Sequence, residues 1–463
     1  MQSEFDHQGT ARVLVPTGML GGGFDPETVN RGIELGANVI AVDGGSTDSG
    51  PHYLGRATAK TAAAAVSRDM AILVKAAKSA GIPLIVGSCG TSGSDAGVDW
   101  ISAMVATIAK DLGTEITVAR IYSEQQPSDI VRYLRQGRVK ALAPAGELDE
   151  ATVERCSHIV GLMGHEPIAE AVLAGADVVL AGRSTDTAVL GAVPLMLGFP
   201  AGPVWHSSKI AECGGLCTTT PMRGGVLVSI DSEGFTIEPL DPEVACTPAS
   251  VAAHMLYENS DPFRMREPAG TLDASKATYV ALDDRRVRVE GSLFEPAEVH
   301  TIKLEGSALA GYETLSIVGI RDPQILSSIE IWSKTFDAVL ASRIESLLQL
   351  DPESYEFSAR YYGWNAVLGD LDPDTTTLPR EVGVVLRVRA HDQDTATAIA
   401  KIANPLLLHL PLPGMDHLPS YAFLTSPAEV ERGPAYEFVL QHAVDVTEPT
   451  ELFRTEIEVL NHG

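Results

Sequence analysis

The stretch AVDGGSTDSGP, at positions 41–51, follows an apolar run and combines carboxylates with hydroxyls and glycines. Asp43 and Asp48 can each act as a base, an acid or a metal ligand. The small residues between them would let the backbone approach a ligand closely, and they are Gly44, Gly45 and Ser46. The structural alternative is a tight turn in which Asp48 serves as a cap. We predict that the stretch forms one wall of a site.

Two further loops carry the same mixture of glycines and polar side chains. GSCGTSGSDAG follows the apolar run IPLIV and supplies Ser88 and Ser92 as substrate-binding residues. AGRSTDTAV follows the run DVVL and supplies Arg183, Ser184 and Asp186. The guanidinium of Arg183 can hold a carboxylate through two hydrogen bonds, although an ion pair with Asp186 would explain the same residues. Together the loops predict a polar cleft for a small carboxylate or a thioester.

The segment AAHMLYENSDPF contains His254, Tyr257 and Glu258 at spacings of three and four residues. Such spacing places side chains on one face of a helix. A histidine, a tyrosine and a glutamate that converge can supply a general acid and a general base. The alternative is an exposed polar face with no function in catalysis.

The segment WHSSKIAECGGLCTTTP allows three interpretations of Cys213. A thiolate at this position could act as a nucleophile. The spacing to Cys217, with His206 nearby, suggests zinc, but structural zinc sites have four ligands and usually a second pair. An ordinary buried cysteine is the third interpretation.

The sequence carries no nucleotide-cofactor signature. The glycine-rich TGMLGGGFDPE matches neither the dinucleotide-binding pattern nor the P-loop, although it could hold an anion at a helix start or form a close-packed turn. A divalent metal such as Mg²⁺ or Mn²⁺, held by Asp43, Asp48 or Glu212, is consistent with the carboxylates, because hard cations take oxygen ligands. No spacing assigns this metal.

The elements that must position these residues alternate between short apolar runs and helical patterns. Such alternation predicts a mostly parallel, Rossmann-like layered α/β domain at residues 11–203, with a partial or variant barrel as the alternative. Its runs are ARVLVPTG, ANVIAVDG, IPLIVGS, EITVARIY, VKALAPAG, HIVGLMG and DVVLAGR. Its helix candidates are Pro26–Leu35, capped by Asp25, and 61–80, 99–112, 127–135, 150–156 and 167–174.

The pattern of expected strands and helices changes after Pro203. Residues 204–370 read as a mixed α+β region with Gly and Asp turns. Residues 381–463 read as a small α+β terminal module, whose helix QDTATAIAKIANPLLLH we expect to be interrupted at Pro405. The sequence therefore predicts three domains.

Composition limits the classes of partner. The 463-residue chain has a formal net charge of −27, which argues against nucleic acid or an anionic membrane as a partner. Its five cysteines form no disulfide framework, its N-terminus lacks an apolar signal core, and no apolar window is long enough to span a membrane. We expect a cytoplasmic protein that forms a homo-oligomer.

The chain resembles the AtuA-like family, which is named for acyclic terpene utilisation and built around a large conserved domain. The stretches that carry the resemblance are DGGSTDSGPHYLG, AGRSTDTAV, AECGGLCT, HMLYENSDPFRMREPAGTLD and GPAYEFVLQH. The resemblance implies a catabolic enzyme that acts on a small, branched carboxylate or its CoA thioester.

The chemistry that fits these residues is that of a lyase of the hydratase or dehydratase type. Asp43 or Glu258 would be the base, and His254 or Tyr257 the acid. Arg183 would hold the substrate, and amides around Ser46 and Ser92 would stabilise the oxyanion. Two other classes stay open: a hydrolase or acyl-transfer enzyme with Cys213 or a serine as nucleophile, and a non-catalytic ligand-binding or scaffolding subunit.

Overall fold

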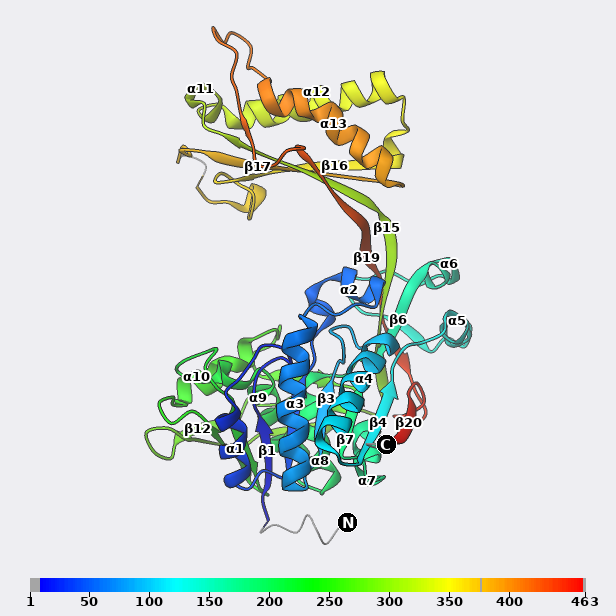
Figure 1. The fold of residues 1–463 in the computed structure, drawn as a ribbon, viewed down its shortest axis with the longest axis vertical. Coiled ribbons are helices and arrows are strands. Elements are labelled where there is room, and N and C mark those ends of the chain that lie inside the picture. The colour runs from blue at the N-terminus through cyan, green and yellow to red at the C-terminus, as the bar shows by residue number, and fades with distance from the viewer. Residues whose placement is uncertain (1–8, 375–376, 461–463) are drawn as a thin grey trace. The chain divides into compact units, whose positions relative to one another are not determined.

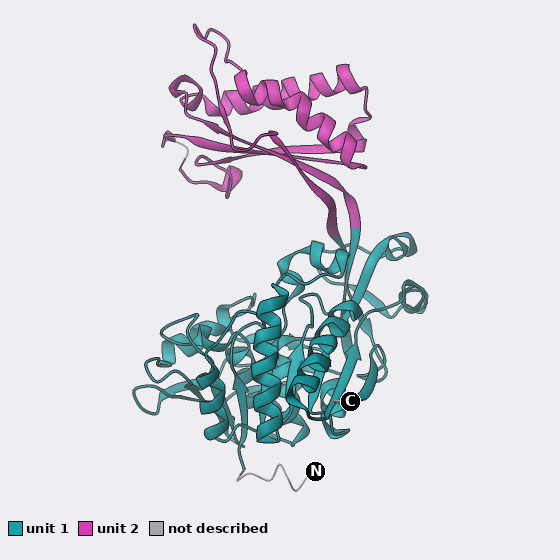
Figure 2. Cartoon of the chain, viewed as in Figure 1, with its two compact units in different colours: residues 1–308, 438–463 teal, residues 309–437 magenta. Residues whose placement is uncertain are grey.

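A computed structural model describes residues 9–374 and 377–460 of the chain. The chain divides into two compact units, one of residues 1–308 and 438–463 and the other of residues 309–437 (Figure 2). The predicted division into 11–203, 204–370 and 381–463 stays a prediction, and residues 461–463 lie outside the described ones. Its first boundary falls inside helix α9 (Ala201–Ala211).

Unit 1 contains, in its described residues, a ten-stranded sheet whose central strands are parallel (Figure 1). These central strands, in spatial order, are β1 (Ala11–Val15), β2 (Val39–Asp43), β3 (Leu84–Gly87), β7 (Val178–Ala181) and β4 (Ile116–Tyr122). Antiparallel strands flank them: β8 (Val226–Ile230), β9 (Gly234–Pro239), β13 (Val287–Glu290) and β12 (Thr278–Ala281) beyond β1, and β20 (Arg454–Leu460) beyond β4.

The central strands are buried because each contributes to an apolar core on both of its faces. In β1, Val13 and Val15 belong to one core and Leu14 to the other, as the alternation of side chains in a strand requires. Helices of the first core are α7 (Glu166–Leu173), α8 (Asp186–Met196), α9 and α10 (Pro248–Ala253). Helices of the second are α1 (Pro26–Glu34), α3 (Ala63–Ala80) and α4 (Asp95–Leu112). The mixed α/β class is confirmed.

Several predicted elements lie where the sequence places them. Helix α1 begins after Asp25, whose Oδ1 accepts a hydrogen bond of 3.1 Å from the amide of Glu27, so the predicted cap is confirmed. The other helices and short strands of unit 1 are α2 (Pro51–Arg56), α5 (Pro127–Arg135), α6 (Glu150–Glu154), β10 (Arg264–Glu267), β11 (Gly270–Asp273) and β14 (Leu293–Pro296).

Two of the seven apolar runs leave the parallel sheet. Strand β5 (Val139–Ala141) pairs with β19 (Glu429–Asp445), and β6 (Cys156–Leu162) pairs with β15 (Thr301–Ile320), both antiparallel. The prediction that these runs continue the parallel sheet is therefore wrong. A short apolar run looks the same in either setting, because its partner lies more than a hundred residues away in the sequence.

Unit 2 packs helices against an antiparallel sheet. Its strands are β16 (Tyr355–Tyr362), β17 (Val382–Ala390), β18 (Ala422–Phe423) and the adjoining parts of β15 and β19. Its helices are α11 (Pro323–Leu326), α12 (Ile329–Leu348) and α13 (Gln393–His409). Helix α13 continues through Pro405, so the predicted interruption is wrong. Leu406 and Leu407, beyond the proline, are buried in the core of unit 2, and this burial offsets the lost hydrogen bond.

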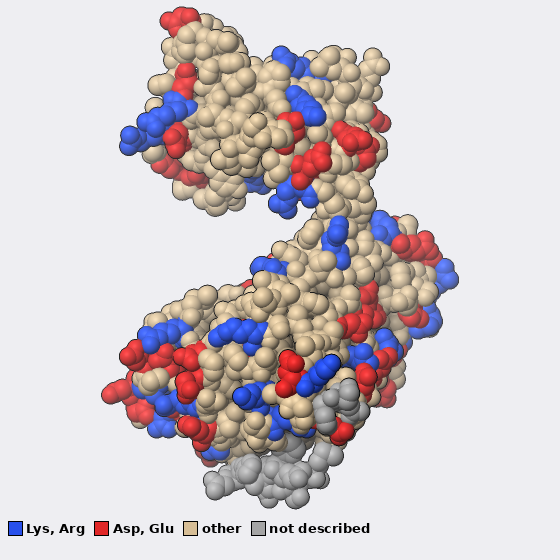
Figure 3. All heavy atoms as spheres, viewed as in Figure 1, with Lys and Arg blue, Asp and Glu red and all other residues tan. Residues whose placement is uncertain are grey.

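Charged side chains of both signs are interspersed on the face that Figure 3 shows, without a broad patch of either sign. Within residues 9–374 and 377–460, the helices lack any stretch with the length and apolar character needed to cross a membrane.

Candidate active site

The loops at the carboxyl ends of the parallel strands converge in unit 1, where ligands bind in sheets of this kind. Strand β2 ends at Asp43, which is 6% exposed. Its Oδ2 accepts a hydrogen bond of 3.0 Å from the amide of Gly45, while its Oδ1 has no partner among the described residues. Burial raises the pKa of Asp43 well above its usual value, and the charge of Asp186 raises it further.

The loop after β3 is held in an unusual backbone conformation beside Asp43. Ser88 has φ of 42° and Thr91 has φ of 80°, a region that β-branched residues rarely adopt. Gly45 lies so close to this loop that a Cβ on it would be 2.6 Å from the Cα of Thr91. The close approach explains the glycine, and strain of this kind is concentrated at functional sites.

Arg183 links three of the loops. Its Nε donates to Glu305 Oε2 on β15 at 2.9 Å, and its Nη1 donates to Ser88 Oγ at 3.2 Å. Thr47, next to the predicted Ser46, donates to the same oxygen of Glu305 at 2.8 Å. The ion pair thus forms with Glu305, and Asp186 contributes only a more distant charge. The role of Arg183 in holding substrate stays a prediction.

Asp186 begins helix α8 and is half-buried, after Thr185, whose side chain caps the helix. Burial raises the pKa of Asp186 to about 6, although Arg183 and Lys209 favour its ionised form. Glu267, at the end of β10, accepts hydrogen bonds from Thr185 at 2.9 Å and from Thr187 at 2.5 Å. Burial raises the pKa of Glu267 to about 7. Carboxyl groups near neutral pKa therefore lie together at this edge of the sheet.

The end of helix α9 adds a buried ion pair to the carboxyl groups. Lys209 Nζ lies 2.5 Å from Glu212 Oε1, and both side chains are 5% exposed. Burial raises the pKa of Glu212 to about 8, against the opposing effect of Lys209. The ammonium of Lys209 also lies 5.6 Å from the centre of the Tyr257 ring, which allows a cation–π contact.

His254, Tyr257 and Glu258 do not share a helix face, so that prediction is wrong. Helix α10 ends at Ala253, a 3-10 turn covers His254–Leu256, and Tyr257 is extended. Further along the chain, Asp261 accepts hydrogen bonds from the amides of Phe263 and Arg264 and forms a separate turn. The rings of His254 and Tyr257 stack instead, with centroids 5.3 Å apart.

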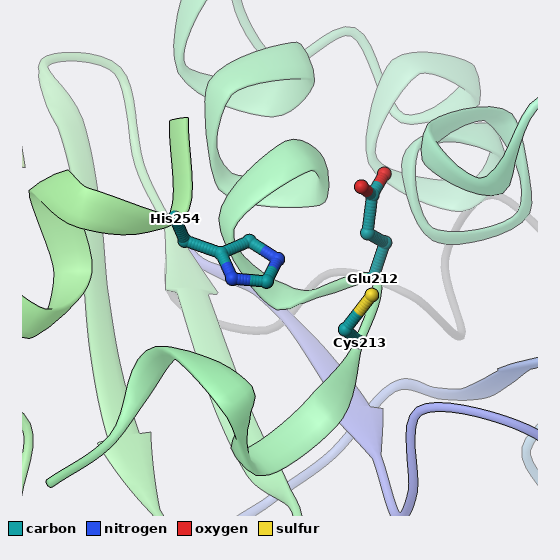
Figure 4. Close-up of side chains that lie close together, drawn as sticks. All are labelled: Glu212, Cys213 and His254. Carbon is teal, nitrogen blue, oxygen red and sulfur yellow. The ribbon is translucent and has the colours of Figure 1, made fainter. Parts of the chain in front are cut away.

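Cys213 lies between this turn and the sheet. It is half-buried, directly after Glu212, and its ligand atom lies within 4.8 Å of those of Glu212 and His254 (Figure 4). Burial and the neighbouring carboxylates raise the pKa of the Cys213 thiol far above its usual value. A backbone contact fixes the position, since a Cβ on Gly18 would lie 2.7 Å from the carbonyl oxygen of Cys213. Free thiolate chemistry is therefore disfavoured at this position.

The remaining predicted residues take local roles or lie unpartnered. Ser46 caps the turn at 47–49, accepting from the amide of Asp48 at 3.1 Å and donating to its carboxylate at 2.8 Å. Asp48 is exposed, near enough to Asp186 for their charges to interact. The hydroxyls of Ser92 and Ser184 are buried without partners among the described residues. The amide of Gly44 donates to the carbonyl of Gly87 at 2.8 Å and ties the first two loops together.

Comparison with protein families identifies the group to which these residues belong. The model of the acyclic terpene utilisation family protein AtuA matches residues 56–200 and 227–439. This chain belongs to that family. Membership suggests a role in the utilisation of acyclic terpenes. No curated protein and no solved structure matches the chain.

The AtuA match covers only part of the converging cluster. Arg183, Asp186 and His254 lie inside the matched ranges, whereas Asp43 and Cys213 lie outside them. The family match alone therefore does not identify the whole cluster. The end of β2 and the loop after α9, which complete the cluster, lie outside the matched ranges.

The AtuA-family fold also brings in residues that sequence reasoning missed. Local patterns assign no role to Glu305, Glu267 or Lys209. A charged residue within a strand gives no local sign that it faces a loop 80 or more residues away, as Glu267 and Glu305 do. Of these three residues, only Lys209 could have been recognised from the sequence. It lies in a helical segment of mostly apolar and small residues, where a buried lysine needs a partner of opposite charge.

Proposed function

We propose that this protein is an enzyme of acyclic terpene utilisation that transfers protons on a small, branched carboxylate or its CoA thioester. The simplest such reaction is the addition or removal of water. Asp186 would remove the proton from the carbon next to the carbonyl. Asp43 would give its proton to the departing hydroxide, so that water leaves and a carbon–carbon double bond forms. Solvent would then return the proton from Asp186 to Asp43.

One observation carries this proposal: the Asp43 and Asp186 carboxyl groups interact and titrate differently. Asp43 is the more deeply buried, and burial raises its pKa well above its usual value, which favours its protonated form. Asp186 is half-buried and titrates near pH 6, so it is ionised at neutral pH. Two carboxyl groups whose environments separate their pKa values are a general mark of an acid and a base.

Donors for a developing oxyanion lie beside this pair. The hydroxyls of Ser92 and Ser184 are buried and, among the described residues, without partners, so they can donate to a substrate oxygen. The strained loop 88–91 and the buried Arg183 ion pair hold these hydroxyls in place before substrate binds. Pre-organised donors of this kind stabilise an enolate-like intermediate.

The acyl-transfer alternative is less well supported. It requires a thiolate or an activated serine, and burial raises the pKa of Cys213. We keep it as the second candidate because Ser92 and Ser184 have free hydroxyls among the described residues. A base within reach of either would be needed, and in the described part of the chain neither hydroxyl has a hydrogen-bonded histidine.

The proposal includes features of the whole protein. We propose that the parallel sheet of unit 1 is a Rossmann-like layer, that the protein works in the cytoplasm, where its five free cysteines stay reduced, and that it forms a homo-oligomer. We further propose that it acts without nucleic acid or membrane partners.

Turnover of a substrate panel tests the proposal. The purified chain is incubated with branched α,β-unsaturated acids and their CoA thioesters, and hydrated products are measured by mass spectrometry. We expect hydration, and we expect Asp43→Asn and Asp186→Asn to abolish it. Asp149→Asn, which alters only the exposed cap of α6, is the matched control and should retain full turnover. A covalent acyl adduct on Cys213 or a serine would favour acyl transfer, and binding without turnover would favour the non-catalytic alternative.

A further inference from the structure

The end of helix α9 and the turn after α10 bring together three side chains of the kinds that bind transition metals. Glu212 offers a carboxylate oxygen, Cys213 a sulfur and His254 a ring nitrogen, and these atoms lie within 4.8 Å of one another. Figure 4 shows the imidazole of His254 pointing from its turn toward the segment after α9 that carries Glu212 and Cys213. Around a zinc ion, tetrahedral ligand atoms are roughly 3.5 Å apart, so small side-chain adjustments suffice.

A second, independent observation points to a ligand at this place. His254 is 5% exposed, and its Nε2 has no hydrogen-bond partner among the described residues. A buried polar atom without a partner costs free energy, so such atoms are rare unless a ligand, an ion or water satisfies them. The stacked ring of Tyr257 holds the imidazole in its orientation.

The surroundings of the three side chains favour a cation. The charges of Asp186 and Glu267 act on Glu212, and Lys209 is the positive charge beside it. Lys209 binds one oxygen of Glu212, Oε1, and leaves the other for an ion. Outer hydrogen bonds to a ligating carboxylate are a regular part of metal sites.

We propose that Glu212, Cys213 and His254 bind a zinc ion. The mixed oxygen, sulfur and nitrogen set suits zinc and does not suit Mg²⁺ or Mn²⁺, which prefer oxygen ligands. Three protein ligands leave a fourth position for water or substrate, as in catalytic zinc sites. This site differs from the sequence prediction, in which Asp43, Asp48 or Glu212 held a hard cation. It uses side chains other than the Asp43–Asp186 pair and does not depend on the proposed reaction.

Cobalt substitution tests the site without an activity assay. The full-length, tag-free chain is stripped of metal with a chelator and titrated with Co²⁺, whose thiolate complexes absorb in the near ultraviolet. We expect one equivalent of Co²⁺, a sulfur-to-cobalt band and displacement by Zn²⁺ but not by Mg²⁺. Absence of the band, or a band displaced equally by Mg²⁺, would contradict the proposal.

Substitution of each of the three side chains tests whether it binds the metal. Cys213→Ser should remove the sulfur-to-cobalt band, and His254→Gln and Glu212→Gln should each weaken zinc binding by at least about tenfold, since even outer partners have effects of that size. Cys156→Ser is the matched control, because Cys156 is half-buried on β6 and donates to the carbonyl of Thr152. Persistence of the band in Cys213→Ser would overturn the assignment.

Thiol mapping keeps the proposal testable if a variant fails to fold. The metal-free wild-type chain is alkylated with and without Zn²⁺, and each cysteine is quantified by mass spectrometry. A sulfur bound to zinc is less nucleophilic than a free thiolate, so zinc should slow alkylation of Cys213 several-fold and leave Cys156 unchanged. Equal protection of both cysteines, or of neither, would contradict a site at Cys213.

Discussion

Arg183 and Glu305 form a buried ion pair of 2.9 Å between residues 122 positions apart in the sequence. Their side chains are 8% and 4% exposed, so neither charge is well solvated without the other. Lys303 and Thr47 complete the hydrogen bonds of the carboxylate, at 2.7 Å and 2.8 Å. The pair therefore fixes the loop after β7 against β15 in unit 1, and with it the strand end that carries Asp186.

Removing one partner of this pair should destabilise unit 1 strongly. Glu305→Gln leaves the Arg183 guanidinium buried without a counter-charge, a loss of about 3–5 kcal/mol in the free energy of unfolding. Urea unfolding followed by circular dichroism measures it. Glu356→Gln, at an exposed ion pair in unit 2, should cost less than about 1 kcal/mol. Equal losses in the two variants would show that burial of the Arg183 pair has no energetic consequence.

The same carboxylate predicts an acid dependence of stability. Burial alone would raise the pKa of Glu305, but Arg183 and Lys303 outweigh it and hold the pKa at about 2, below the ordinary value of 4.5. The folded state therefore binds its proton less readily than the unfolded state does. The stabilisation, about 3 kcal/mol, is complete above pH 4.5 and is lost as the pH falls toward 2.

Unfolding of the wild type and of Glu305→Gln between about pH 3 and pH 6 measures this contribution. The difference in stability between the two should shrink as the pH falls below about 4.5. A difference that stays constant across this range would mean that Glu305 keeps an ordinary pKa in the folded protein.

The loops after β2 and β3 pack so closely that a single added methyl group at Gly45 should lower stability. Gly45 has φ of 135°, and a Cβ there would lie 2.6 Å from the backbone of Thr91. Gly45→Ala should lower the free energy of unfolding by about 1–3 kcal/mol and displace the amide that binds Asp43. Gly146→Ala, where nothing lies within 4 Å of the added Cβ, should be close to neutral. Thermal unfolding compares the two, and matching melting temperatures would rule out the predicted clash.

The ionisation of Asp186 predicts the pH profile of turnover. Burial raises its pKa to about 6, with Arg183 and Lys209 opposing and Glu258 and Asp48 adding to the rise. Because a base must be ionised, kcat/KM should increase about tenfold per pH unit below about pH 6 and level off above it. Glu258→Gln should move this midpoint to lower pH, since it removes a neighbouring negative charge. A midpoint near pH 4 would show that Asp186 is not the base.

Sequence patterns predicted the strand ends well, and for a physical reason. A buried strand followed by glycines and short polar residues is a local signal, so the sequence alone places Asp43, Ser88 and Arg183 at one sheet edge. The sheet partners of β5 and β6 were not predictable, because pairing depends on a strand about 150 or more residues away.

The contacts within the candidate site that were not predicted join residues far apart in the sequence. Glu305 binds Arg183, whereas the sequence offered Asp186 as the alternative partner, and no local pattern around Arg183 or Glu305 shows this. The helix expected to carry His254 and Tyr257 ends at Ala253 and continues as a 3-10 turn, and the spacing of the polar residues did not reveal this end. In the fold His254 stacks on Tyr257 and lies near Cys213, and spacing alone does not reveal either contact.

Hydrogen exchange at the substrate carbon tests the central claim most directly. The wild-type protein is incubated in heavy water with a saturated branched acyl-CoA, and deuterium at the carbon next to the carbonyl is measured by mass spectrometry. We predict incorporation of solvent deuterium that disappears in Asp186→Asn and persists in Asp149→Asn. Undiminished incorporation in Asp186→Asn, with the variant folded, would contradict the assignment of Asp186 as the base that removes this proton.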